Sequence, residues 1–309
     1  MIAIDLGSNS FRCIEYDCKT KMFGRSFERI VKTADQMHQT GCISEEAVKR
    51  IVEALKEADA VLELHKNPVQ AVTTQAMRMA SNSTEVLQRI KDESGVAFEI
   101  ISPDDEARYT LSAVDARLKA LKIDNGHFVL IDVGGGSSEI IFYKEGRMQS
   151  RSFPIGIVTT AQICDEEQEI GSYLTEQFKE VEAYVAHYYA KEGKPTAYVA
   201  TAGTPTTMAA YLLGMNYADY DVEKINGYLL TYEGTQKALE DLRAMPEKQR
   251  AEIVGVGRES LIIAGIVIVQ KLYTVLGFEQ AIVVDDGVRE GVAIAYCRET
   301  ESDQSAGEN

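Results

Sequence analysis

The chain lacks an excess of positive charge. Its 309 residues include 32 Lys and Arg against 48 Asp and Glu, which gives a formal net charge of −16. A negative surface repels the phosphates of nucleic acids and the headgroups of anionic membranes. The composition therefore predicts neither a nucleic-acid partner nor a membrane partner. A polyanionic substrate would have to be met by local basic groups, main-chain amides or a metal ion.

Other absences narrow the class of protein further. The longest apolar run, Leu261 to Val269, is too short to span a bilayer and indicates a buried helix. The five cysteines are scattered and odd in number, which disfavours a disulfide framework, and the four histidines do not cluster. The chain has neither a Walker A lysine motif nor a G-x-G-x-x-G fingerprint. Its first residues read as a strand and a glycine turn rather than a targeting peptide, so we expect a cytoplasmic protein.

What the chain does contain is an internal repeat. The segment IDLGSNS at 4–10 aligns with IDVGGGS at 131–137, and each copy opens a strand–turn–strand pattern followed by helices and strands. Such a repeat predicts two related α/β domains, with a cleft between them as the default binding site. We place the first domain at residues 1–121 and the second at 122–292. The last helix, about residues 293–309, is expected to pack back onto the first domain.

The second copy of the repeat carries the strongest chemical pattern. Asp132 ends a buried strand, and Glu139 lies on the returning strand after a glycine turn. Glycines let main-chain amides approach an anion closely, and a pair of carboxylates can hold Mg²⁺. The alternative is a glycine hairpin that binds nothing. The turn itself consists of Gly134, Gly135, Gly136 and Ser137, and the first copy offers Asp5, Ser8, Asn9 and Ser10 in the same places.

Three further segments are weaker candidates. Gly203 and Thr204 stand where a strand runs into a helix, whose free N–H groups could bind an anion, although this could be an ordinary connection. Arg78 and Arg289 lie beside turns, where an arginine either binds phosphate or forms a surface ion pair. Glu106 follows two aspartates at a helix start, and the local pattern by itself suggests only a complement to the helix dipole.

Six segments follow one another along the chain: IDLGSNSFR at 4–12, AVTTQAMRMASN at 71–82, EIISPDDEARY at 99–109, LIDVGGGSSEI at 130–140, GTPTT at 203–207 and DDGVREG at 285–291. In this order they resemble the exopolyphosphatase/guanosine pentaphosphate phosphohydrolase (Ppx/GppA) family. The resemblance implies an α/β fold of two actin-like domains, as in acetate kinase, sugar kinases and actin. It also implies Mg²⁺-assisted hydrolysis of the terminal phosphoryl of polyphosphate or of pppGpp, a reaction of the stringent response, and a homodimer.

The resemblance also assigns roles to single residues. Glu106 becomes the catalytic base that activates water, and Asp132 and Glu139 become metal ligands, to which we add Asp5 from the first copy of the repeat. Phosphate binding is assigned to Ser8, Asn9, Ser10, Arg78, Gly134, Gly135, Gly136, Ser137, Gly203 and Thr204.

The chain departs from the family pattern in two places. IVKTADQMHQTG at 30–41 replaces a basic stretch that lies near the substrate in the family, and the helical C-terminal extension of longer members is missing. The second departure favours a short substrate. Two alternative functions stay open at this point: a kinase of the same superfold, and a non-catalytic regulator that binds (p)ppGpp or another nucleotide.

Overall fold

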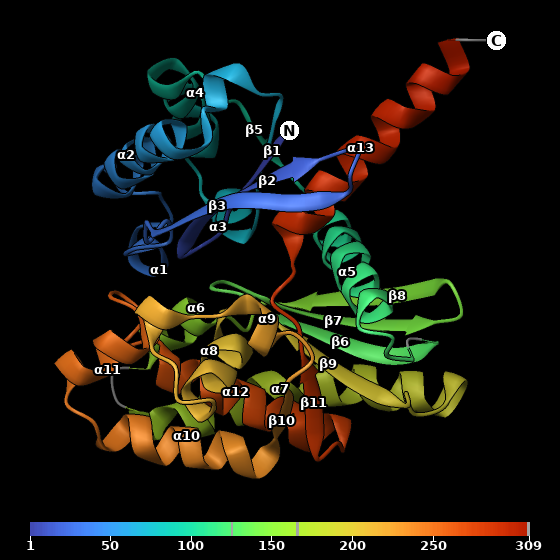
Figure 1. Cartoon of the computed structure of the whole chain (residues 1–309). Coiled ribbons are helices and arrows are strands. Elements are labelled where there is room, and N and C mark those ends of the chain that lie inside the picture. The colour runs from blue at the N-terminus through green and yellow to red at the C-terminus, as the bar shows by residue number, and fades with distance from the viewer. Residues whose placement is uncertain (125, 165–166, 308–309) are drawn as a thin grey trace. The chain divides into compact units, whose positions relative to one another are not determined.

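The computed structural model describes residues 1–124, 126–164 and 167–307. The chain divides into two compact units, one formed by Met1–Val114 with Asp286–Asn309 and the other by Asp115–Asp285 (Figure 1). The division therefore falls a few residues before each of the two predicted boundaries. Each unit is described by itself below.

The first unit is built on a five-stranded sheet with the order β3-β2-β1-β4-β5. β1 lies at its centre, antiparallel to β2 and parallel to β4. Gly7 separates β1 from β2, and the two strands pair directly across this turn. The strands are β1 (Ile2–Leu6), β2 (Ser10–Asp17), β3 (Met22–Ile30), β4 (Val69–Thr73) and β5 (Phe98–Ile100).

One helix of the first unit begins at a residue whose side chain caps it. The Ser44 side chain accepts a hydrogen bond from the Ala47 amide at 3.2 Å and so caps α2. α13 packs on β1 and β2 through a cluster that includes Ala3 and Ile14 of the sheet. The helices are α1 (Met37–Thr40), α2 (Glu45–Leu62), η1 (Leu64–Lys66), α3 (Gln75–Met79), α4 (Ser83–Ser94), α5 (Pro103–Ala120), whose end passes into the second unit, and α13 (Val288–Gly307).

The second unit is built on a six-stranded sheet with the order β10-β11-β9-β6-β7-β8. β6 is antiparallel to β7 and parallel to β9, so β6 occupies the place that β1 has in the first sheet. The strands are β6 (His127–Val133), β7 (Ser138–Lys144), β8 (Arg147–Phe153), β9 (Ala197–Thr201), β10 (Leu229–Thr231) and β11 (Gln280–Val283).

The helices of the second unit enclose one large apolar core. The apolar run Leu261 to Val269 falls largely in α12, a buried helix that packs on α7 and α10. None of the described helices is long and apolar enough to cross a membrane. The helices are α6 (Ile157–Ile163), α7 (Glu167–Glu192), α8 (Gly203–Leu212), η2 (Tyr217–Asp219), α9 (Val222–Ile225), α10 (Tyr232–Ala244), α11 (Glu247–Val254) and α12 (Ile262–Leu276).

The internal repeat is real at the level of topology. In each unit three consecutive strands form an antiparallel meander, β1–β2–β3 and β6–β7–β8, and the next strand of the chain joins the sheet in parallel beside the first. The predicted α/β fold class with a repeated strand-rich unit is therefore confirmed.

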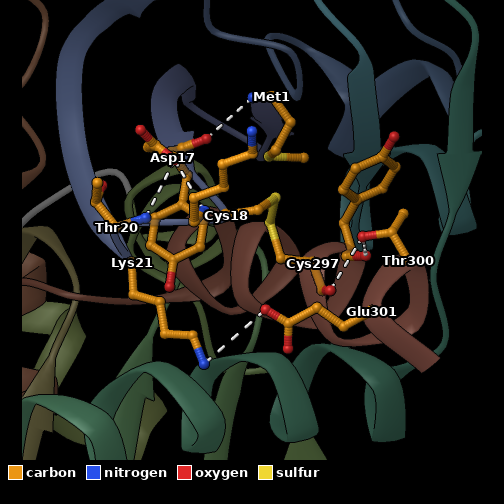
Figure 2. The surroundings of a disulfide bond; sticks show 11 residues. Met1, Asp17, Cys18, Thr20, Lys21, Cys297, Thr300 and Glu301 are labelled. Atoms are coloured by element: carbon orange, nitrogen blue, oxygen red, sulfur yellow. Dashed lines mark hydrogen bonds and ion pairs between the residues drawn. A yellow bond between two sulfur atoms is a disulfide. The ribbon is translucent and has the colours of Figure 1, made fainter. Parts of the chain in front are cut away.

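One feature differs from the expectation for the cysteines. A disulfide joins Cys18, in the turn between β2 and β3, to Cys297 of α13 (Figure 2). Cys13, Cys42 and Cys164 are thiols outside this disulfide. The two bridged residues are 279 positions apart, so their spacing gave no indication of the bond.

Candidate active site

Asp132 and Glu139 lie directly opposite each other on β6 and β7 of the second unit. Both residues are buried, with 8% and 2% of their surfaces exposed. The hydroxyls of Ser137 and Ser152 donate to the same oxygen, Oε1 of Glu139, at 2.8 and 2.7 Å. Two like charges directly opposite on neighbouring strands repel, so this pair suits a bound cation.

The pair fits the predicted Mg²⁺ on chemical grounds. Mg²⁺ is commonly held by one or two carboxylates and keeps several waters or phosphate oxygens as its other ligands. Among the described residues no group of three or more His, Cys, Asp or Glu side chains is placed to hold a metal ion. Asp5 belongs to the other unit, and its role as a third ligand stays a prediction.

The glycine turn between β6 and β7 is held from one side. The Gly134 amide donates to the Ser137 carbonyl at 2.9 Å, while the carbonyls of Gly134 and Gly135 accept from the amides of Ile157 and Val158 at 3.0 and 2.8 Å. The structure gives the amides of Gly135 and Gly136 no acceptor within the described part of the chain. Because the carbonyls are engaged by the start of α6, these two amides are the donors left for an anion.

The start of α8 follows on the neighbouring strand. Thr201, the last residue of β9, pairs with Asp132, and Ala202 then takes a left-handed conformation with φ of 71° before the helix begins at Gly203. A non-glycine residue at such a φ is uncommon and typical of functional turns. The first amides of α8 have no partner inside the helix and suit an anion. Thr204 is buried against Gly265 of α12, so only its main chain fits the predicted phosphate contact.

The corresponding turn of the first unit, Ser8 to Ser10, is supported in the same way. The Gly7 amide donates to the Ser10 carbonyl at 2.9 Å. The Asn9 carbonyl accepts from the amides of Val31 and Lys32, each at 2.9 Å, and the Ser8 carbonyl accepts from Ala34. The first residues of the atypical segment 30–41 therefore hold this turn in place through their main-chain amides.

Glu106 is the one acid of its helix start that is withdrawn from solvent. Asp105 accepts from the Ser102 hydroxyl at 2.6 Å and also pairs with Arg108, so it serves the helix cap. Glu106 is 8% exposed, and its Oε2 accepts from Nη2 of Arg78 at 2.8 Å. A buried, charge-paired carboxylate is a candidate for proton transfer.

Arg78 is itself held by two neighbours. Its Nη1 donates to the Ile101 carbonyl at 2.8 Å, and its Nη2 donates to Oε1 of Gln75 at 3.1 Å. The guanidinium thus holds the Glu106 carboxylate in place, whereas its predicted contact with phosphate stays untested. α3 follows β4, and the Thr73 hydroxyl at the end of β4 donates to the Leu6 carbonyl at 2.8 Å. Arg78 therefore follows the strand next to the one that carries Asp5, and Glu106 follows β5, the strand beyond it.

The structure adds residues that the sequence did not single out. Ser152 reaches Glu139 only because β8 pairs with β7, and Gln75 reaches Arg78 across one turn of α3.

In the first turn of α13, Glu290 accepts a hydrogen bond from Nε of Arg289 at 2.5 Å. Burial raises the pKa of the Cys13 thiol, the positive charge of Arg289 opposes that rise, and the negative charge of Asp5 adds to it. The charges of Arg289, a candidate phosphate ligand, and of Asp5 therefore both act on the Cys13 thiol.

The chain as a whole is similar to known proteins. The family model of the Ppx/GppA phosphatases matches residues 24–299. The chain belongs to the Ppx/GppA phosphatase family. It is therefore a member of a hydrolase family, as the sequence predicted.

Relatives of known name or structure cover nearly the whole chain. Exopolyphosphatase 2 of Mycobacterium tuberculosis is 26% identical over 95% of this chain and 97% of its own length. The Aquifex aeolicus PPX-GPPA enzyme is 30% identical with a TM-score of 0.71, covering 95% of this chain and 98% of that structure. An exopolyphosphatase from Cytophaga hutchinsonii shares the fold, with a TM-score of 0.83 at 22% identity over 96% and 97% of the two chains.

Proposed function

We propose that the chain hydrolyses phosphoanhydride bonds and releases the terminal phosphate of inorganic polyphosphate. The observation that carries the proposal is the buried pair Asp132 and Glu139, set beside a glycine turn whose free amides suit phosphate. The names of the mycobacterial and Cytophaga relatives support polyphosphate as the substrate.

The second unit would supply phosphate binding. The amides of Gly135 and Gly136 and the first amides of α8 donate to phosphate oxygens, and Asp132 and Glu139 would hold Mg²⁺. When bound, the ion supplies positive charge to a substrate that this strongly acidic chain would otherwise repel. Ser137 and Ser152 keep the Glu139 carboxylate oriented through their hydroxyl hydrogen bonds.

The first unit would supply the general base. Glu106 orients a water and accepts its proton as the water oxygen attacks the terminal phosphorus and the bridging P–O bond breaks. Arg78 holds the carboxylate through the 2.8 Å hydrogen bond, and Gln75 holds Arg78. The dissociative character of phosphoryl transfer means that positioning and charge matter more here than covalent help.

The test is phosphate release by the purified chain on polyphosphates of several lengths, on pppGpp and on ATP with a phosphoryl acceptor, each with and without Mg²⁺. The proposal predicts Mg²⁺-dependent release from polyphosphate that needs no acceptor. Faster release from pppGpp would move the substrate to guanosine nucleotides. Acceptor-dependent consumption of ATP, or tight nucleotide binding without release, would contradict hydrolysis and favour a kinase or a regulator.

A further inference from the structure

The disulfide ties an exposed turn to a buried residue of α13 within the first unit. Cys18 is half-buried in the turn between β2 and β3, and Cys297 of α13 is only 4% exposed. The two Cα atoms lie 5.3 Å apart, within the ordinary range for a disulfide. Figure 2 shows the bond beside the first residue of the chain, with Lys21 and Glu301 reaching toward each other next to it. That ion pair is exposed and 4.0 Å long, so the disulfide is the stronger link between the turn and the helix.

α13 in turn braces the helix that carries Glu106. Gly291 of α13 lies so close to α5 that a Cβ atom on it would stand 2.0 Å from the Tyr109 carbonyl oxygen. Farther along, Nη1 of Arg298 donates to the Ser112 hydroxyl at 3.4 Å. Tyr109 lies one helical turn after Glu106 on α5. A displacement of α13 therefore reaches the backbone that positions the Glu106 carboxylate.

The two bridged cysteines also differ in exposure, which suits thiol–disulfide exchange at one of them. Cys18 lies between the exposed residues Asp17 and Lys19, whereas Cys297 packs in the cluster formed by α13 and the sheet. Thiol–disulfide exchange depends on which sulfur an attacking thiolate can reach. Cys18 is the more exposed residue of the two, so we expect attack at its sulfur and release of the Cys297 sulfur first.

We propose that Cys18 and Cys297 form a reversible redox modification site for low-molecular-weight thiols of the glutathione type. In the bridged state α13 is fixed against the sheet and holds α5, so that Glu106 is positioned for turnover. In the cleaved state the turn is no longer tied to α13, and α5 loses part of its brace. The effect on turnover rests on the proposed hydrolase function, but the loosening of α13 does not.

The chemistry balances with the thiol as reductant. A thiolate attacks the Cys18 sulfur, forms a mixed disulfide and releases the Cys297 thiolate, which takes a proton from solvent. A second thiolate attacks the mixed disulfide, releases the Cys18 thiolate and leaves with the first as the small-molecule disulfide. The reverse reaction uses that small-molecule disulfide as oxidant and restores the bridge.

The experiment equilibrates the full chain with reduced or oxidised glutathione and measures three quantities. Thiols titrated after denaturation should rise from three, those of Cys13, Cys42 and Cys164, to all five. Backbone hydrogen exchange should become faster in α13 and α5 on reduction. Phosphate release should fall by about tenfold, because a small misplacement of a catalytic group is costly.

Two variants decide between a redox site and a general effect of thiols. Cys18→Ser with Cys297→Ser should match the reduced protein in exchange and turnover and ignore glutathione, whereas Cys42→Ser should respond like the wild type. Five thiols in the oxidised sample, or unchanged exchange in the double variant, would overturn the proposal. If exchange changes but neither state releases phosphate, the redox site stands and the proposed hydrolase function fails.

Discussion

The two strand–turn–strand units of this chain share one architecture but differ in charge at one position. In the first unit Asp5 on β1 lies opposite Arg12 on β2, and in the second Asp132 on β6 lies opposite Glu139 on β7. In both, the carbonyls of the turn are held by amides of the segment that follows the third strand. The acid–base pair is neutral by itself, whereas the acid–acid pair has two negative charges to balance.

The difference indicates that the two units contribute different groups to the proposed reaction. The second unit has the carboxylates and free glycine amides that a metal-bound phosphate needs. The first unit has serine and asparagine in its turn, together with the Arg78–Glu106 pair, whose members follow β4 and β5. The comparison favours Asp132 and Glu139 over Asp5 as ligands of Mg²⁺. Each of the following variants tests one side of it.

The largest effect is expected at the general base of the first unit. Glu106→Gln keeps the hydrogen bond from Arg78 possible but cannot accept a proton, so kcat should fall by about 10²–10⁴-fold with the circular dichroism spectrum unchanged. Asp104→Asn, an exposed acid of the same helix turn, is the matched control and should keep nearly full activity. Equal turnover by Glu106→Gln and the wild type would remove Glu106 from the mechanism.

The next effect contrasts the two hairpins directly. Glu139→Gln should lower phosphate release at a fixed, limiting Mg²⁺ concentration by about 10²-fold, because one of two carboxylate ligands is lost. Chelation of Mg²⁺ should abolish release from the wild type. Arg12→Gln changes the equivalent position of the first unit and should cost less than about tenfold. A larger loss for Arg12→Gln than for Glu139→Gln would reverse the assignment.

Two glycines, one in each unit, pack closely against the segments that carry the proposed phosphate-binding turn and the proposed general base. A Cβ on Gly156 would lie 2.3 Å from the Gly135 carbonyl oxygen, and one on Gly291 would lie 2.0 Å from that of Tyr109. Each alanine variant should lose about 1–3 kcal/mol of stability, or roughly 3–10 °C in melting temperature. Gly156→Ala should chiefly raise KM for polyphosphate, whereas Gly291→Ala should chiefly lower kcat. The same kinetic change in both variants would argue against separate roles.

The smallest expected change in turnover concerns the covalent link that only the first unit has among the described residues. Loss of a disulfide that closes so long a loop removes roughly 2–4 kcal/mol of stability. Reduction should therefore speed hydrogen exchange in β1, β2 and α13 and leave β6, β7 and α12 unchanged. Equal loosening of both units would show that reduction acts generally rather than at Cys18 and Cys297.

Much of this arrangement could be predicted from the sequence, because it rests on local patterns. The repeated seven-residue segments at 4–10 and 131–137 predict both turns, and the alternation of apolar residues predicts the strands around them. The sequence does not indicate α6, because its seven residues have no capping side chain and only two buried residues to mark a face.

The interactions that the sequence did not reveal are tertiary. The contact of Ser152 with Glu139 depends on strand register, and the disulfide joins residues 279 positions apart. Glu106 is buried and Asp105 is not, because the face of α5 that carries Glu106 packs against Arg78. A run of three acids in the sequence does not indicate which of them faces inward. Family resemblance, rather than local pattern, singled out Glu106.

The most direct test of the central claim is Mn²⁺ binding, measured by electron paramagnetic resonance without substrate, with Mn²⁺ standing in for Mg²⁺. The account predicts one site whose Kd rises at least about tenfold in Glu139→Gln and stays within about twofold of the wild type in Arg12→Gln. A Kd that is unchanged in Glu139→Gln, or that shifts equally in both variants, would contradict the assignment of the metal to the second hairpin.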